Sequence, residues 1–127
     1  MPSSPIRVLL VEDDEDDYVI AMDHFFRLPG QRFALDWVCT YPEAVVEIAK
    51  KKHDVLVFDY RLGVDNGLDL LAEVRAKGCQ APVIMWTRFV DRALESKARQ
   101  AGANDFFIKS QVTPAALERS IMTALGQ

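Results

Sequence analysis

The sequence predicts an α/β fold, in which five parallel strands form a doubly wound (βα)5 sheet with helices on both faces. Segments with strand and helix patterns alternate five times along the 127 residues. The predicted strands are apolar almost throughout, which is typical of parallel strands that are buried on both faces. The helical segments between them supply the crossovers that a parallel sheet requires.

The predicted strands are short apolar runs. The first begins at Ile6 and ends at Val11, is interrupted only by Arg7, and is followed at once by acidic residues. Such a run beside a polar segment is typical of a buried strand. The other four predicted strands cover residues 33–39, 54–59, 82–86 and 106–108.

The segments between the strands have the spacing of helices. In residues 15–28 one stripe is apolar, and we expect that stripe to face the core. It consists of Ile20, Ala21, Phe25 and Leu28. Pro29 and Gly30 end this helix. The other predicted helices cover residues 40–52, 68–76, 91–101 and 113–125.

Composition limits the class of protein. Half of the residues are apolar and the formal net charge is −4, which argues against disorder and against nucleic-acid binding. Cys39 and Cys79 form no CxxC motif, and we expect both to be reduced in a cytoplasmic protein. No signal peptide or membrane span is indicated. We therefore expect residues 1–127 to form a single domain without an effector domain.

Reactive side chains follow four of the predicted strands. They are Glu12, Asp13, Asp59, Thr87 and Lys109. Because the carboxyl ends of parallel strands share one edge of a sheet, we expect these side chains to converge there. Carboxylate oxygens are ligands that Mg²⁺ prefers, and a carboxylate can accept a phosphoryl group. A lysine and a hydroxyl can hold the oxygens of that group, so the pattern predicts phosphoryl acceptance by Asp59 at a magnesium site.

Five short motifs carry a resemblance to a known family. They are Val-Glu-Asp-Asp at 11–14, Val-Phe-Asp-Tyr-Arg-Leu at 57–62, Asn-Gly-Leu at 66–68, Trp-Thr at 86–87 and Phe-Phe-Ile-Lys at 106–109. In order and spacing the chain resembles the CheY-like receiver domains of two-component response regulators. The resemblance implies a flavodoxin/CheY-like sheet with the strand order 2-1-3-4-5.

The resemblance also implies a role for each matching residue. Glu12, Asp13, Asp59 and the backbone carbonyl of Arg61 would bind Mg²⁺, and Asp59 would be the phospho-acceptor. Lys109 would bind the phosphate, Thr87 would be the switch hydroxyl, and Phe106 would be the switch aromatic.

The partners that the resemblance implies are a sensor histidine kinase or a histidine phosphotransfer protein, and a downstream protein target. No catalysis is expected beyond the domain's own phosphorylation and dephosphorylation.

Three positions depart from the family pattern. Ser110 follows Lys109 where the family usually has a cis-proline, so the lysine loop is expected to be trans or differently shaped. Arg88 replaces the small residue that usually follows the switch hydroxyl, which narrows access to the site. The loop at residues 61–67 lacks the common methionine-proline pair. None of these changes removes a reacting group.

Two other functions compete with this interpretation. A pseudo-receiver would bind partners without phosphorylation, although the acceptor, the hydroxyl and the lysine are all present. An aspartyl-phosphate phosphatase of the haloacid-dehalogenase type needs Asp-x-Asp, whereas Tyr60 and Arg61 follow Asp59. The acids at 14–17 are explained by the helix dipole alone, which favours negative charge at a helix start.

The first helix is also apolar on a second side. Tyr18, Val19, Met22 and Phe26 lie on the flank opposite the core stripe. A helix that is apolar nearly all round must be covered on both sides. We therefore expect a partner to dock on these four residues, with a homodimer contact as the alternative.

Overall fold

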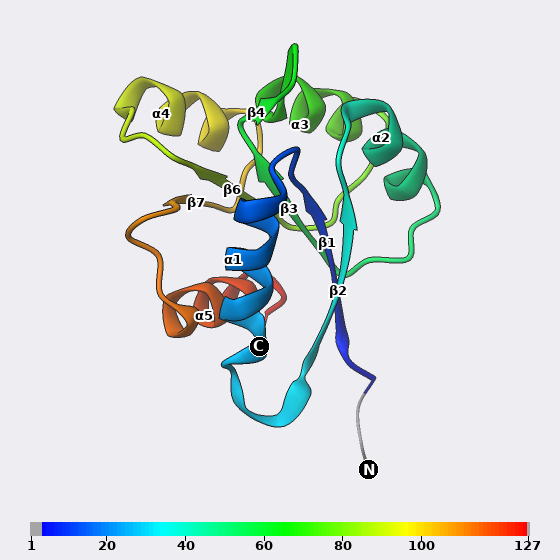
Figure 1. Cartoon of the computed structure of the whole chain (residues 1–127). Helices are drawn as coiled ribbons and strands as arrows, with labels where there is room; N and C mark the ends of the chain where they lie inside the picture. Colours follow the sequence, from blue (N-terminus) through cyan, green and yellow to red (C-terminus); the bar gives the residue numbers. More distant parts are fainter. Residues whose placement is uncertain (1–3, 127) are drawn as a thin grey trace.

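The computed structural model describes residues 4–126, apart from the side chain of Gln31, and these residues contain five α-helices around a central sheet (Figure 1). A short 3-10 helix, η1 (Pro29–Gln31), follows the first of them. The strands of the sheet are β1 (Ile6–Val11), β2 (Phe33–Val38), β3 (Val55–Asp59), β6 (Val83–Thr87) and β7 (Asp105–Ile108). The helices are α1 (Glu15–Phe26), α2 (Tyr41–Ala49), α3 (Gly67–Ala76), α4 (Arg92–Gln100) and α5 (Pro114–Ala124). None of these helices is long and apolar enough to cross a membrane.

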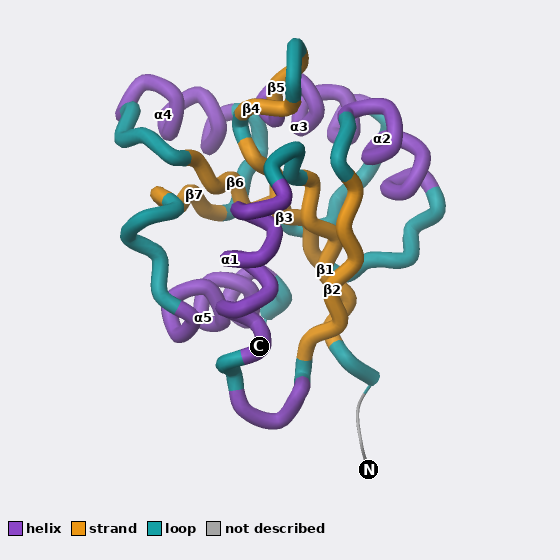
Figure 2. Tube along the Cα trace, viewed as in Figure 1, coloured by secondary structure: helices purple, strands orange, loops and turns teal. Residues whose placement is uncertain are grey.

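All five strands of the sheet run parallel, in the order β2-β1-β3-β6-β7. In chain order this is the predicted 2-1-3-4-5, so the expected fold class and topology are confirmed. The segment after β3 was expected to be a plain loop. Instead β4 (Arg61–Leu62) and β5 (Asp65–Asn66) form a small antiparallel hairpin outside the main sheet (Figure 2).

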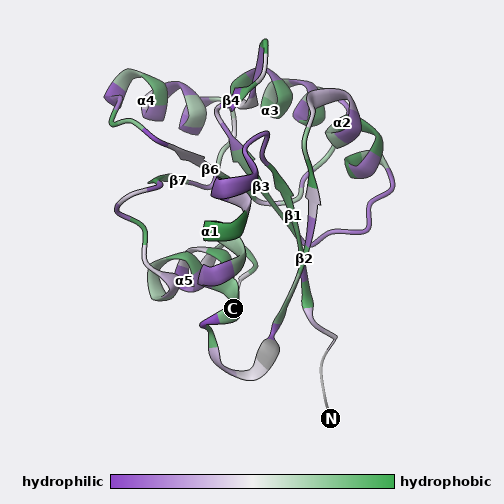
Figure 3. Cartoon of the chain, in the orientation of Figure 1, coloured by the Kyte–Doolittle hydropathy of each residue, from purple (hydrophilic) through white to green (hydrophobic). Residues whose placement is uncertain are grey.

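The sheet separates two apolar layers. Alternate residues of β1 face opposite sides, because successive side chains of a strand point to opposite faces. Val8 and Leu10 pack with α1 and α5, whereas Leu9 and Val11 pack with α2, α3 and α4. In Figure 3 the strand β1 is coloured as hydrophobic, while the first turn of α1 beside its end is strongly hydrophilic. The two apolar layers thus fix the sheet, and the polar residues lie where β1 ends and α1 begins.

The core stripe of α1 differs from the predicted stripe at one residue. Ala21, Phe25 and Leu28 are buried as expected, but Ile20 is 45% exposed, so its assignment to the core was wrong. The buried positions within the helix are 17, 21 and 25, which are four residues apart. Ile20 lies about 100° round the helix from Ala21, on the flank of this stripe.

Gly67 allows α3 to begin directly against the end of β3. Its backbone N–H donates to the carbonyl of Tyr60 at 2.7 Å. A β-carbon at this position would collide with the backbone carbonyl oxygen of Asp59. The absence of a side chain at Gly67 therefore lets the chain turn back within one hairpin while Asp59 keeps its place at the sheet edge.

We expect Gly67→Ala to destabilise the domain by about 3 kcal/mol, because the collision involves backbone atoms that cannot rotate away. Urea unfolding measures this loss. Gly78→Ala is the control, since a β-carbon there meets open space and only the positive φ of 91° adds strain. That strain is about 1 kcal/mol. Equal losses for the two variants would contradict the proposed contact.

Candidate functional site

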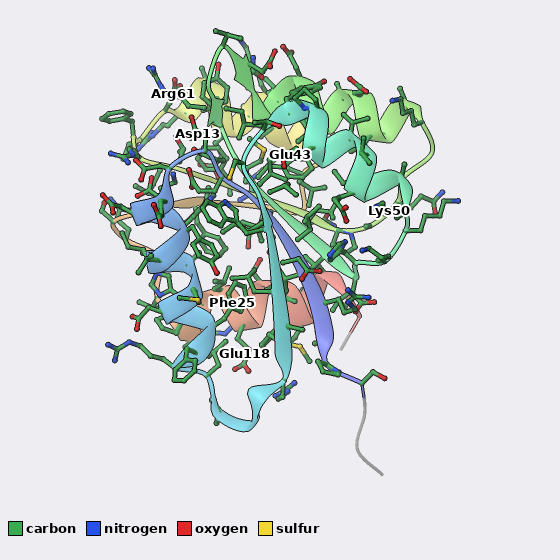
Figure 4. The ribbon with its side chains drawn as sticks, turned by 45° about the vertical axis from the view of Figure 1, so that its right-hand side comes forward. Asp13, Phe25, Glu43, Lys50, Arg61 and Glu118 are labelled. Atoms are coloured by element: carbon green, nitrogen blue, oxygen red, sulfur yellow. The ribbon has the colours of Figure 1, made fainter. Side chains whose placement is uncertain are left out.

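The carboxyl ends of β1, β3 and β6 surround a pocket of about 450 Å³. It is lined by Asp13, Asp14, Asp17, Asp59, Arg61, Thr87, Arg88 and Phe89. Figure 4 shows Asp13 and Arg61 at this end of the molecule, the first after β1 and the second in the hairpin after β3. The predicted convergence at one edge of the sheet is therefore present.

Three carboxylates of the pocket region form a compact cluster. One oxygen from each of Glu12, Asp13 and Asp59 lies within 4.8 Å of the others. Glu12 is fully buried and Asp59 is 5% exposed, whereas Asp13 is open to solvent. The backbone N–H of Gly63 donates to Asp13 Oδ2 at 3.0 Å, so the loop of the hairpin fixes this carboxylate. Three oxygen donors with one open side suit a hard divalent cation.

Burial changes the acidity of two members of the cluster. Burial, followed by the hydrogen bond to Asp59, raises the pKa of Glu12 to about 8. Burial also raises the pKa of Asp59. Buried neighbouring carboxylates resist ionising together, so without a cation Glu12 holds its proton to a higher pH than an exposed glutamate does. A divalent cation could take the place of that proton, which is the behaviour expected of a metal site.

The ammonium group of Lys109 lies among buried acids. Its Nζ is 2.8 Å from Glu12 Oε1, 2.7 Å from Asp17 Oδ2 and 3.2 Å from Asp59 Oδ1. Nζ also lies 4.8 Å from the centre of the Trp86 ring. Burial opposes the charged form, but the hydrogen bonds to Asp17 and Glu12 outweigh it and raise the pKa of Lys109. This side chain therefore stays cationic next to Asp59.

Of the other predicted site residues, Thr87 and Arg61 line the pocket, whereas Phe106 does not. Thr87 is buried and lines it, and its carbonyl accepts from the Lys109 backbone N–H at 2.7 Å. Arg61 also lines the pocket, and the metal-binding role of its carbonyl stays a prediction. Phe106 is 8% exposed and packs in the layer of α2, α3 and α4, outside the pocket lining. The Lys109–Ser110 peptide is trans, one of the two expected forms.

Sequence reasoning missed the role of Asp17. The helix-dipole explanation is incomplete for Asp14, whose side chain caps α1 by accepting from Asp16 and Asp17 backbone N–H groups but also contacts Arg88. It is insufficient for Asp17, which is 7% exposed and contacts Lys109 and Arg88. A signal was present in the sequence: Asp17 stands four residues before Ala21, so it continues the buried stripe of the helix.

The predicted docking residues are only partly free. Tyr18 is half-buried and stacks on Trp37 with ring centres 4.0 Å apart. The indole N–H of Trp37 in turn donates to the Glu12 carbonyl at 2.7 Å. The remaining three candidates, Val19, Met22 and Phe26, are 48%, 41% and 84% exposed. Tyr18 therefore supports the site from one side, while the other three leave an apolar surface on α1.

We expect the stability of the metal-free protein to fall as pH rises from about 5 to 8. The pKa of Glu12 is about 8 in the folded chain, against an ordinary value of 4.5 for a glutamate in water. The folded state therefore binds more protons in this window, and raising the pH removes that advantage. Glu12→Gln should reduce the fall by on the order of 2 kcal/mol. Urea unfolding in EDTA at several pH values measures it.

Glu15→Gln is the control, because Glu15 is an exposed glutamate of the same helix start. Burial also lowers the pKa of His24, but this histidine is present in all three proteins, so its contribution cancels from the comparison. If the free energy of unfolding falls equally with pH in the parent and in Glu12→Gln, the raised pKa of Glu12 is contradicted.

Comparison with known proteins gives a consistent result. The profile of the response regulator receiver domain matches residues 8–121. The alginate biosynthesis transcriptional regulatory protein AlgB of Pseudomonas aeruginosa is 32% identical over 105 residues, 81% of this chain and 22% of that protein. The two-component response regulator PhoP of the same organism is 30% identical over 105 residues, 82% of this chain and 45% of that protein. The chain thus spans less than half the length of these two relatives.

Solved structures agree on the fold. The crystal structure of a CheY-like response regulator receiver domain protein from Methanospirillum hungatei superposes with a TM-score of 0.82 at 22% sequence identity. The match covers 97% of this chain and 95% of that one. With the acidic cluster, the lysine and the hydroxyl at the expected edge of this sheet, the profile match settles the classification. The chain belongs to the response regulator receiver domain family of two-component signalling.

Proposed function

We propose that this receiver domain accepts a phosphoryl group on Asp59 in a Mg²⁺-dependent reaction. The donor is a sensor histidine kinase or a histidine phosphotransfer protein. The observation that carries the proposal is the position of Lys109, whose Nζ lies 3.2 Å from Asp59 Oδ1 inside a ring of buried acids. A cation held in contact with the Asp59 carboxylate is suited to bind the group that this carboxylate receives.

The residues of the pocket divide the reaction among them. A carboxylate oxygen of Asp59 forms a bond to phosphorus as the phosphorus–nitrogen bond of the donor phosphohistidine breaks. The imidazole leaves as a neutral ring when its other nitrogen carries a proton. Lys109 binds an oxygen of the transferred group, and the hydroxyl of Thr87 donates to another.

Glu12, Asp13 and Asp59 would hold Mg²⁺, together with the carbonyl of Arg61. The bound ion would offset the negative charge of the acids and of the phosphoryl group during transfer. The backbone of Gly63 orients Asp13 for this task through its 3.0 Å hydrogen bond. The burial of Glu12 and the open side of Asp13 support a cation that keeps part of its water shell.

Phosphorylation would switch the contacts of this domain with a downstream protein. Thr87 lies at the end of β6, and its carbonyl is bonded to the backbone of Lys109 after β7. Movement of Thr87 toward the phosphoryl group would therefore be transmitted to β7, which carries Phe106. The result is a shift between two arrangements that phosphate contacts stabilise unequally.

We assign no reaction beyond the domain's own phosphorylation and dephosphorylation, and no direct contact with nucleic acid. AlgB and PhoP are named as regulators, and AlgB as a transcriptional one, but this chain matches only part of each. The free thiols of Cys39 and Cys79 support a cytoplasmic location, where such groups stay reduced.

The acceptor is tested with acetyl phosphate and Mg²⁺, followed by trapping of the acyl phosphate and mass mapping. We expect label on Asp59 alone, complete loss of label in Asp59→Asn, and no label in EDTA. Asp65→Asn is the matched control, because Asp65 is an exposed aspartate of the nearby hairpin and should label normally. A pseudo-receiver would remain unlabelled in all conditions, and a phosphatase would instead turn over a generic phosphate ester.

We further propose that the kinase or phosphotransfer protein docks on the exposed apolar flank of α1. Val19, Met22 and Phe26 form this flank, and Phe26 is 84% exposed. Apolar side chains that are exposed together on one helix mark interaction surfaces. The flank belongs to the helix that also supplies Asp17 to the pocket, so a partner docked there contacts an element of the site.

Met22→Asp and Phe26→Asp should each slow phosphotransfer from the protein donor by about tenfold, as loss of an interface hot spot does. Labelling by acetyl phosphate should be unchanged, because the small donor needs no docking. The donor is first identified by a survey of purified histidine kinases and phosphotransfer proteins. Val46→Asp on α2 is the control, since Val46 is 59% exposed on another helix. A dimer interface would instead show as a change in oligomeric state.

A further inference from the structure

Asp17 connects the two cations of the site through a single oxygen. Its Oδ2 accepts from Lys109 Nζ at 2.7 Å and from Arg88 Nε and Nη2 at 3.1 and 2.9 Å. Arg88 also reaches Asp14 Oδ2 at 2.6 Å. The start of α1 is thereby tied to the residues that follow β6 and β7.

Lys109 is shared unequally between the acids around it. Its Nζ is closer to Asp17 Oδ2, at 2.7 Å, than to Asp59 Oδ1, at 3.2 Å. Charge-assisted hydrogen bonds are strong in a buried site. A phosphoryl group on Asp59 must therefore compete with Asp17 for the ammonium. Glu12 is a weaker competitor in the proposed function, because its carboxylate is then a metal ligand.

Arg88 determines how easily Asp17 can release Lys109. A buried carboxylate that loses its only cationic partner is strongly destabilising. Asp17 keeps Arg88 when Lys109 turns away, so its charge stays compensated. The Arg88 side chain is 53% exposed, so its existing hydrogen bonds to Asp17 can strengthen without any loss of packing in the core.

We propose that Asp17 and Arg88 form an exchange pair that sets how tightly Lys109 binds the phosphoryl group. In the unphosphorylated domain Asp17 retains Lys109. When the group is present, Lys109 contacts the group and Arg88 alone compensates Asp17. Asp17 is thus a positioning residue that acts through Lys109. The inference rests on the proposed function, because it concerns the same acceptor.

The two residues should have effects of opposite sign on the binding of beryllofluoride, which stands in for the phosphoryl group on Asp59. Asp17→Asn should tighten binding by about fivefold, because an amide holds the ammonium less strongly. Arg88→Gln should weaken binding by about fivefold, because Asp17 is then left with Lys109 as its only cation. Arg88→Lys should restore most of the loss.

A double-mutant cycle distinguishes the exchange from a general effect of charge. In the Asp17→Asn background, Arg88→Gln should change the beryllofluoride affinity by less than about twofold, since its effect acts through Asp17. Binding is followed in saturating Mg²⁺ by tryptophan emission, because the ring of Trp86 lies 4.8 Å from Lys109 Nζ. Asp59→Asn supplies the blank.

Asp16→Asn is the matched control. Asp16 is exposed, is the neighbour of Asp17 on the same helix, and carries the same charge, but it contacts neither cation among the described side chains. Its replacement should leave the affinity unchanged. Asp17→Asn should fold, since Lys109 retains Glu12 and Asp59 as partners. If it does not, Arg88→Gln and its rescue by lysine still decide the question.

The outcomes separate this inference from the function on which it rests. A parent protein that binds no beryllofluoride in Mg²⁺ overturns both. Two results overturn the exchange pair alone when the parent does bind beryllofluoride. One is a weaker affinity in Asp17→Asn, and the other is additive effects of the two substitutions in the double-mutant cycle. Unchanged affinity in Arg88→Gln also overturns it. The exchange pair is supported if Asp17→Asn and Arg88→Gln change the beryllofluoride affinity in opposite directions and if Arg88→Gln has no effect in the Asp17→Asn background.

Discussion

The placement of one ammonium group among buried carboxylates is the interaction on which the site depends. Lys109 Nζ contacts Glu12, Asp17 and Asp59, which are 0%, 7% and 5% exposed. Without this cation the three acids would repel one another in a region that water barely reaches. The Lys109 ammonium offsets the charge of these buried acids, and in the proposed function the same group binds the phosphoryl oxygens.

Backbone contacts hold this arrangement in place. The bond from the Lys109 N–H to the Thr87 carbonyl sets β6 and β7 side by side at the site, and the N–H of Gly63 orients Asp13. Gly67 lets α3 start against the Asp59 carbonyl. The apolar layers on the two faces keep the five strands in register, so that the chemistry of the edge can vary while the sheet does not.

The alternation of apolar strands with helical segments was sufficient to predict a parallel sheet and the edge where the site lies, because apolar runs and strand ends are local features. The strand order, by contrast, was implied by the resemblance to receiver domains. Side-chain partnerships across the fold were harder to predict. Ile20 was placed in the core because it is next to Ala21 in the sequence, and the apolar pattern alone does not show which of two neighbouring positions faces the core. Asp17 was assigned to the helix dipole, since only the fold brings Arg88 and Lys109 to it. Phe106 was found in the core layer, outside the pocket lining.

The site is assembled from residues that are far apart along the chain. Lys109 meets Glu12 across 97 positions and Asp17 across 92. Closing loops of this length costs chain entropy. Lys109 directly follows β7, so it reaches these acids only when β7 lies beside β6 in the sheet. A sheet without β7 would therefore hold three buried acids without the cation that they share.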